Sequence, residues 1–180
     1  MKRIPRRFRA LLPLLAPTIA LVFIASIVLS GPVRAGLIKT FGAWSAFDET
    51  EGGRKVCYIG STPTKQRGKY KKRGEAYILV THRPAEKTRG VVSIKAGYAY
   101  KKGSDVQVNV GSQRFMLFTD KDHAWARDAG GDKKLVAAMQ AGSQMIVTGS
   151  SGRGTKTVDT YSLSGFTAAL NAINKACGVK

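Results

Sequence analysis

Acidic residues and histidines are scarce in this chain of 180 residues. There are 11 acids against 30 lysines and arginines, and only two histidines, His82 and His123. A zinc site would need both histidines and at least one acid to converge, and nothing in their spacing favours this. The chain also lacks a G-x-S-x-G nucleophile elbow and the local signature of a catalytic cysteine. We therefore predict no metal, no cofactor and no enzyme activity.

A phosphate-binding P-loop is nearly present at 149–157 but lacks the required spacing. Gly149 and Gly154 have the separation of a G-x4-G pattern, yet Thr155 stands before Lys156, where the lysine should follow the glycine directly. The residues that follow alternate as a strand does, so they offer no helix N-terminus to a phosphate. We interpret 149–157 as a tight turn between two strands.

The first 35 residues contain no acid and have the pattern of an export signal. Five basic residues precede a long apolar run, and Val33 and Ala35 occupy the −3 and −1 positions of a cleavage site after Ala35. A basic start, an apolar centre and a small-residue exit indicate a secretory signal peptide. An uncleaved membrane anchor is the alternative, because the apolar run is long enough to span a bilayer. Both interpretations place residues 36–180 outside the cytoplasm.

Residues 36–180 are sufficient for one domain with its own core. Six of the 30 basic residues lie in 1–35, which leaves 24 against 11 acids and a net charge of +13. The chain has only two cysteines, Cys57 and Cys177. In an exported protein an even number of cysteines indicates a disulfide, and two cysteines allow one pairing. Two free buried thiols are the alternative.

Most of residues 36–180 have the pattern of short strands. Val106, Val108 and Val110 alternate with polar residues, and alternation or β-branched and aromatic content marks seven stretches before residue 130: 41–47, 55–61, 75–83, 90–100, 105–111, 113–120 and 123–127. A short helix is expected at 132–143, then two more strands, then a C-terminal helix. This order predicts a mainly β fold: an antiparallel β-sandwich or barrel-like domain with a short helix and a C-terminal helix packed against it.

The C-terminal helix is expected to begin after Ser164 as N-cap and to end at Gly178. Its apolar residues share one face, which is formed by Phe166, Ala169, Leu170, Ile173 and Cys177. Cys177 therefore lies on the buried side of the helix. A bond to Cys57, in an early strand, would tie this helix to the sheet and close a loop of about 120 residues.

A basic segment separates two of the expected strands. Six of the nine residues from Lys65 to Arg73 are basic, namely Lys65, Arg67, Lys69, Lys71, Lys72 and Arg73. We expect these residues to form a loop. Such a run suggests nucleic acid in a cytoplasmic protein, but the export signal removes that partner. A solvated loop that only keeps the protein soluble is one interpretation, because charge runs are often just solvated.

The C-terminal third resembles a known family. The stretch "GSSGRGTKTVDTYSLSGFTAALNAINKAC" and the earlier "FGAW" at 41–44 are similar to the invasion associated locus B family of Gram-negative, mainly alphaproteobacterial, envelope proteins. The matching motif residues, which we interpret as structural, are Trp44, Arg153, Gly154, Thr155, Tyr161, Gly165 and Phe166. Ala43 departs from the common Asp, and an additional early cysteine of many relatives is missing, so a second disulfide is not expected.

The resemblance implies an exported β-rich protein of the periplasm, outer membrane or cell surface, linked in some pathogens to host-cell invasion. It implies no catalytic residue. We therefore expect a non-enzymatic protein whose basic segment, with Arg83, Lys87 and Arg89 as further cations, binds an anionic envelope component. Lipopolysaccharide, anionic lipid and acidic polysaccharide are the candidate ligands, because Arg suits bidentate phosphate contacts and Lys adds point charge. An envelope or host protein is another possible partner.

A periplasmic enzyme or enzyme inhibitor with an unrecognised site is the alternative function. A hydrolase would require a deep cleft lined by His82 or His123 together with an aspartate. An inhibitor of a basic enzyme such as lysozyme would need a complementary acidic surface, for which a domain of this positive charge is poorly suited.

Overall fold

A computed structural model describes residues 36–179 of the chain. The predicted signal peptide, residues 1–35, lies outside the described residues. In chain order the elements are β1 (Gly36–Phe41), β2 (Trp44–Glu51), β3 (Arg54–Ser61), β4 (Lys65–Gly68), β5 (Tyr77–Arg83), the 3-10 helix η1 (Pro84–Glu86), β6 (Thr88–Lys95), β7 (Val106–Val110), β8 (Gln113–Asp120), β9 (His123–Trp125), α1 (Ala129–Ala141), β10 (Gln144–Ser150), β11 (Lys156–Ser162) and α2 (Phe166–Cys177).

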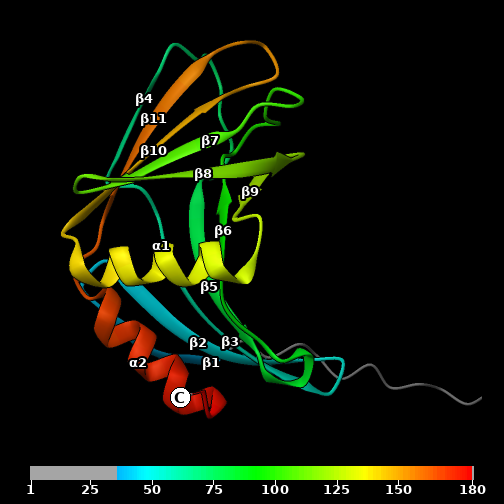
Figure 1. Cartoon of the computed structure of the whole chain (residues 1–180), viewed down its shortest axis with the longest axis vertical. Coiled ribbons are helices and arrows are strands. Elements are labelled where there is room, and N and C mark those ends of the chain that lie inside the picture. The colour runs from blue at the N-terminus through cyan, green and yellow to red at the C-terminus, as the bar shows by residue number, and fades with distance from the viewer. Residues whose placement is uncertain (1–35, 180) are drawn as a thin grey trace, which may run out of the picture. The chain divides into compact units, whose positions relative to one another are not determined.

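The mainly β prediction, with a short helix and a C-terminal helix, is confirmed. Within the described range, 11 antiparallel strands form one open sheet in the order β1-β2-β3-β5-β6-β9-β8-β7-β10-β11-β4. The short strand β9 pairs with both β6 and β8, which makes the sheet continuous. Figure 1 shows β1, β2, β3 and β5 beside α2, and β7, β10, β11 and β4 at the other end of the sheet. The edges of the sheet are therefore β1 and β4.

The helix α2 covers the β1–β5 end of the sheet with its predicted apolar face. Phe166 and Ile173 are fully buried there. Trp44, at the start of β2, is also fully buried, and its ring meets Phe166 edge-on with centroids 4.9 Å apart. The Trp44 Nε1–H donates to the Ser162 carbonyl at 2.9 Å. A core between the sheet and α2 thus joins the first strands to the last helix.

The N-terminus of α2 differs from the prediction. Its N-cap is Gly165, at a φ of 87°, and Ser164 makes no side-chain cap. The Ser164 carbonyl accepts from the Ala43 amide at 3.0 Å, and a Cβ on Gly165 would overlap the Phe41 carbonyl oxygen. Because the β1–β2 turn passes so close, only a glycine fits before the helix. The C-terminus agrees with the prediction, since Gly178 caps α2 in the left-handed conformation.

The predicted disulfide is confirmed. Cys57 of β3 and Cys177 at the end of α2 are bonded, with an S–S distance of 2.04 Å and a Cα–Cα distance of 6.0 Å. The bond joins residues 120 positions apart, so it ties the C-terminal helix to the sheet as expected.

The strand expected over 90–100 ends early, and this positions the candidate site. β6 stops at Lys95, and Gly97 adopts a φ of 74°. The Gly97 carbonyl accepts from the Gly74 amide at 2.9 Å, and a Cβ at Gly97 would overlap the Gly74 backbone. Tyr98 and the residues after it therefore leave the β6 strand and cross toward β10, where Tyr100 bridges Ser151.

Candidate functional site

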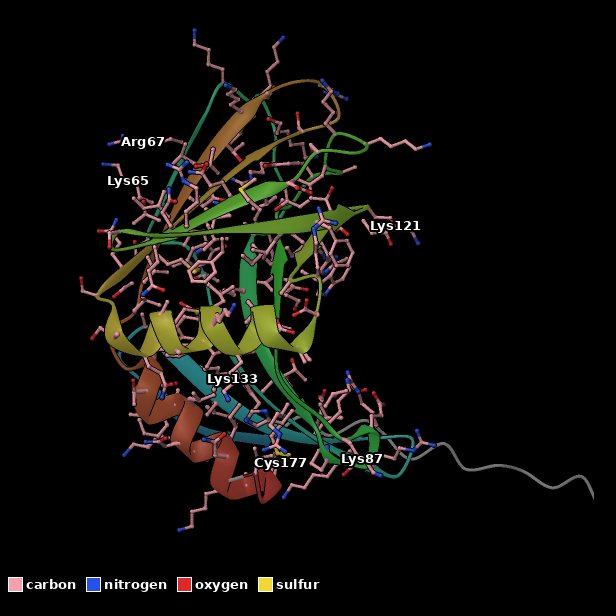
Figure 2. The ribbon with its side chains drawn as sticks, in the orientation of Figure 1. Lys65, Arg67, Lys87, Lys121, Lys133 and Cys177 are labelled. Carbon is pink, nitrogen blue, oxygen red and sulfur yellow. A yellow bond between two sulfur atoms is a disulfide. The ribbon has the colours of Figure 1, made fainter. Side chains whose placement is uncertain are left out.

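The basic segment, residues 65–73, begins as a strand and not as the expected loop. Lys65 and Arg67 belong to β4, which pairs with β11 through Thr160 and Val158. All four residues of β4 are exposed. Figure 2 shows Lys65 and Arg67 projecting from the same side of this edge strand. These two cations lie on the sheet edge and do not line the cavity described below.

The side chain of Arg73 is buried, unlike those of the other cations of the basic segment. Its side chain is 3% exposed and that of Asp159, on β11, is 4% exposed. The two make a bidentate pair with N–O distances of 2.7 and 2.5 Å, and Arg73 Nε–H also donates to the Ala96 carbonyl at 2.7 Å. Burial alone would lower the pKa of the guanidinium, but the hydrogen bonds and charge of Asp159 outweigh it and raise the pKa. Arg73 therefore fixes the end of the basic segment onto the sheet.

The other three cations of the basic segment surround a cavity of about 770 Å³. Lys69, Lys71 and Lys72 form the wall that comes from the basic segment, and Arg153 and Thr155 form the wall that comes from the β10–β11 turn. A second hollow, of about 610 Å³, shares Lys69, Arg153 and Thr155 and adds Lys156. Among the residues that the structure describes, no acidic side chain lines either hollow. We call the larger one the basic cavity.

The floor of the basic cavity is aromatic and hydrogen-bonded. The Tyr98 and Thr157 hydroxyls lie 2.5 Å apart, and the Arg73 guanidinium lies 5.0 Å from the Tyr98 ring centroid. Burial raises the pKa of Tyr98, so its hydroxyl stays neutral at physiological pH. The floor therefore adds a ring face and hydroxyl groups but no net charge, because Asp159 neutralises Arg73.

The turn that carries Arg153 is held by its own backbone and confirms the expected tight turn at 149–157. The Ser151 amide donates to the Thr155 carbonyl, and the Gly154 amide donates to the Ser151 carbonyl. Gly154 has a φ of 82°, which favours glycine. The Gly152 amide donates to the Ala99 carbonyl at 2.8 Å, which fixes the turn against the segment after β6.

The resemblance motif is divided between this site and the core. Arg153 and Thr155 line the basic cavity and Gly154 lines the second hollow. Trp44, Gly165 and Phe166 lie at the α2 interface. Tyr161 is fully buried, and its hydroxyl has no hydrogen-bond partner within the described residues. Two residues of the site, Asp159 and Tyr98, were not foreseen. The signal for Asp159 was present: it is an acid at an inward position of a strand, between Thr157 and Tyr161.

The histidines lie apart from the basic cavity. His82 is buried; its Nε2 lies 2.7 Å from Asn174 Oδ1 on α2, and its Nδ1 accepts from the Gly90 amide at 2.8 Å. His123 stacks on Trp125 and contacts Asp122. Within residues 36–179, no group of three or more His, Cys, Asp or Glu side chains is placed to hold a metal ion.

The additional cations named with the basic segment do not join it. Arg83, at the end of β5, forms an ion pair with Glu51, at the end of β2, in which Nη1 and Oε2 are 2.5 Å apart. Figure 2 places Lys87 at the opposite end of the described domain from Arg67. The cations that converge are therefore those of 69–72 and 151–156.

The arrangement can hold an anionic group. Three lysines and an arginine line one hollow to which no acid of residues 36–179 contributes, so the local potential is positive. Arg153 can make a bidentate contact to a phosphate or carboxylate, and the lysines can contribute point charges. The cavity volume lies in the range typical of small-molecule sites.

Comparison with known proteins identifies one family. No curated protein and no solved structure matches the chain. No helix within residues 36–179 has the length and apolar content needed to cross a membrane. Residues 44–174 match the sequence model of the family described as Invasion associated locus B (IalB) protein, a range that includes Trp44, the basic segment and the β10–β11 turn. The chain therefore belongs to the invasion associated locus B family.

Proposed function

We propose that this protein is an exported, non-enzymatic protein that binds an anionic component of the bacterial envelope in the basic cavity. One observation carries the proposal: cations from two distant parts of the sequence, 69–72 and 153, line one hollow in which no acid of residues 36–179 takes part. Lipopolysaccharide phosphate, an anionic lipid headgroup and an acidic polysaccharide share the required chemistry. An acidic surface of an envelope or host protein is the alternative occupant.

The buried pair below the cavity supports a binding role. Arg73 and Asp159 hold the end of the basic segment, and the Gly74–Gly97 hydrogen bond holds the residue after it. Lys71 and Lys72 are therefore attached to a fixed backbone position. Pre-ordering of a loop reduces the entropy lost on binding, so a ligand here would bind more tightly than on a free chain of the same charge.

The lining of the basic cavity supports a binding role. The cavity is lined by lysines, arginines, tyrosines and small polar residues, and neither histidine reaches it. Export is expected from residues 1–35 and accords with the family. Together these observations favour an envelope ligand over a substrate.

The test removes the lysines of the cavity and leaves the buried pair intact. The variant Lys69→Gln/Lys71→Gln/Lys72→Gln is compared with Lys133→Gln/Lys134→Gln/Lys175→Gln, which removes three exposed lysines from the helices. Retention of the exported protein on native outer-membrane vesicles is measured at low and high salt. We expect the cavity variant to lose retention and the helix variant to keep it. Wild-type retention should weaken at high salt, where screening is short-ranged. Equal retention by the two variants would rule out the basic cavity as the binding site.

A further inference from the structure

Cations outside the basic cavity gather at the same end of the sheet. Three loops meet there: 69–74, 97–103 and 151–155. Figure 1 shows the segments that follow β4, precede β7 and join β10 to β11 at this end. The Lys101 amide donates to the Ser150 carbonyl at 2.9 Å, so Lys101 and Lys102 lie beside the turn that carries Arg153. We call this the three-loop end.

The three loops carry positive charge, and the acids Glu75 and Asp122 line a separate hollow beside Gly74 and Gly97. The exposed cations of the three-loop end are Lys69, Lys71, Lys72, Lys101, Lys102 and Arg153, and Lys156 follows at the start of β11. The three loops contain no acid. Lys101 and Lys102 line neither hollow, so a small anion bound in the basic cavity would leave them without a role.

The three-loop end also exposes an aromatic ring. Tyr70 stands between Lys69 and Lys71 and is 37% exposed, and the Arg73 guanidinium lies 5.6 Å from its ring centroid. A tyrosine ring has an apolar body and a polar tip, which suits the headgroup layer of a bilayer. Lysines beside it can extend their charged ends to lipid phosphates while their stems stay along the protein.

We infer that the three-loop end docks on a bilayer surface rich in anionic phospholipid, with Tyr70 in the headgroup layer. The lipid surface specifies the anionic component, so the inference rests on the proposed function. Two features favour a surface over an isolated ligand. The charges come from three loops and extend beyond one hollow, and all but one are lysines, whose point charges suit a field of many phosphates better than one bidentate contact.

The test uses co-sedimentation of the exported protein with vesicles of defined composition. Vesicles of phosphatidylcholine with phosphatidylglycerol are compared with vesicles of phosphatidylcholine alone. The variant Lys101→Gln/Lys102→Gln is compared with Lys133→Gln/Lys134→Gln, an equal change of charge on α1. Each lysine near an anionic surface contributes about fivefold in affinity at low salt, so the first variant should bind about 30-fold more weakly and the second as wild type.

A second variant tests the aromatic contact separately from charge. Tyr70→Ser should weaken binding to the anionic vesicles and leave the dependence on salt unchanged, because it removes no charge. Equal binding to the two kinds of vesicle, or wild-type binding by Lys101→Gln/Lys102→Gln, would overturn the lipid surface. Competition by free inorganic phosphate at the same phosphate concentration would also overturn it, in favour of an isolated anion in the cavity.

These outcomes separate this inference from the proposed function. Suppose that native outer-membrane vesicles retain the protein through Lys69, Lys71 and Lys72, but phosphatidylglycerol vesicles do not bind it. Then the lipid surface is wrong and the basic cavity stands, with polygalacturonate as the next probe for an acidic polysaccharide. If neither kind of vesicle distinguishes the variants, both proposals fail.

Discussion

Arg73 shows how much the environment of one residue decides its role. It lies within a run of cations of similar sequence context, yet its charge is neutralised by Asp159 in the interior. The neighbouring Lys71 and Lys72 remain exposed. A charge run in a sequence reports composition but not burial, so only the structure separates these residues. What the sequence did contain was the lone acid at an inward strand position, which requires a buried partner.

Removing only one charge of the Arg73–Asp159 pair should lower the free energy of unfolding more than removing both charges. Asp159→Asn leaves a buried guanidinium without its carboxylate, and we expect the free energy of unfolding to fall by about 3–5 kcal/mol. In the double variant Arg73→Met/Asp159→Leu neither charge is buried, so much of the loss should be recovered. Urea denaturation measures both. A double variant less stable than Asp159→Asn would contradict this account.

His82 should make stability depend on pH. Burial lowers its pKa below the ordinary value of 6.5, and because Nδ1 accepts from the Gly90 amide, the proton of the neutral ring is on Nε2, facing Asn174. Below pH 6.5 the unfolded chain gains a proton on this residue that the folded chain does not. The contribution of His82 to the free energy of unfolding is therefore fully present above pH 6.5. It is lost as the pH falls from 6.5 toward the lowered pKa, by up to about 1.4 kcal/mol per pH unit.

The two histidines provide a matched comparison for this pH dependence. His82→Gln should remove the histidine component of the stability loss below pH 6.5, measured as urea midpoints across pH. His123→Gln should retain it, because His82 is unchanged. If both variants follow the wild-type curve, His82 is not the responsible group.

At the scale of elements, periodicity predicted what depends on local pattern. The apolar spacing from Phe166 to Cys177 identified the face of α2 and, with it, the side of the helix that carries the disulfide. Strand alternation identified β7 closely, because valines and polar residues alternate there without interruption. The start of α2 was missed because Gly165, not Ser164, is fixed by a contact with the β1–β2 turn, which no local pattern contains. The early end of β6 was missed for the same reason, since Gly74 meets Gly97 across the fold.

Substitution of Gly165 and of Gly154 can separate the energetic cost of a positive φ from the cost of steric overlap. Both have positive φ, but a Cβ at Gly165 would overlap the Phe41 carbonyl, whereas a Cβ at Gly154 meets nothing within 4 Å. Gly154→Ala should cost about 1–2 kcal/mol for conformation alone. Gly165→Ala should cost more than Gly154→Ala, because α2 or the β1–β2 turn must also shift. Equal losses in urea denaturation would show that the turn gives way freely.

For the described domain as a whole, the sequence predicted the class of fold and not the order of the strands. Short alternating strands indicated antiparallel β structure. The pairing of β4 with β11 and of β6 with β9 depends on contacts between distant residues, so neither was predictable from alternation. The basic cavity was missed for this reason as well: its two walls are brought together only when β4 joins the edge of the sheet.

Removal of the disulfide should destabilise the domain. Cys57→Ser/Cys177→Ser opens a covalent loop of 120 residues, and in the chain-entropy account the loss is up to about 4–5 kcal/mol. When the wild-type protein is treated with reductant, its midpoint of urea denaturation should fall to about that of the Cys57→Ser/Cys177→Ser variant. The double variant should not respond to reductant, which is the control. A wild-type protein whose midpoint is unaffected by full reduction would contradict the prediction.

The partners of the early core residues have a consequence for when the protein can fold. Trp44 packs on Phe166, Cys57 bonds to Cys177, and Arg73 pairs with Asp159. The partner of each of these three early residues lies after β10 in the sequence. During synthesis the growing chain therefore cannot complete its core, because closure depends on contacts of long sequence separation. The domain remains incompletely folded until α2 emerges, and a truncated chain that ends before β11 would expose Trp44 and Cys57, which α2 covers in the complete domain.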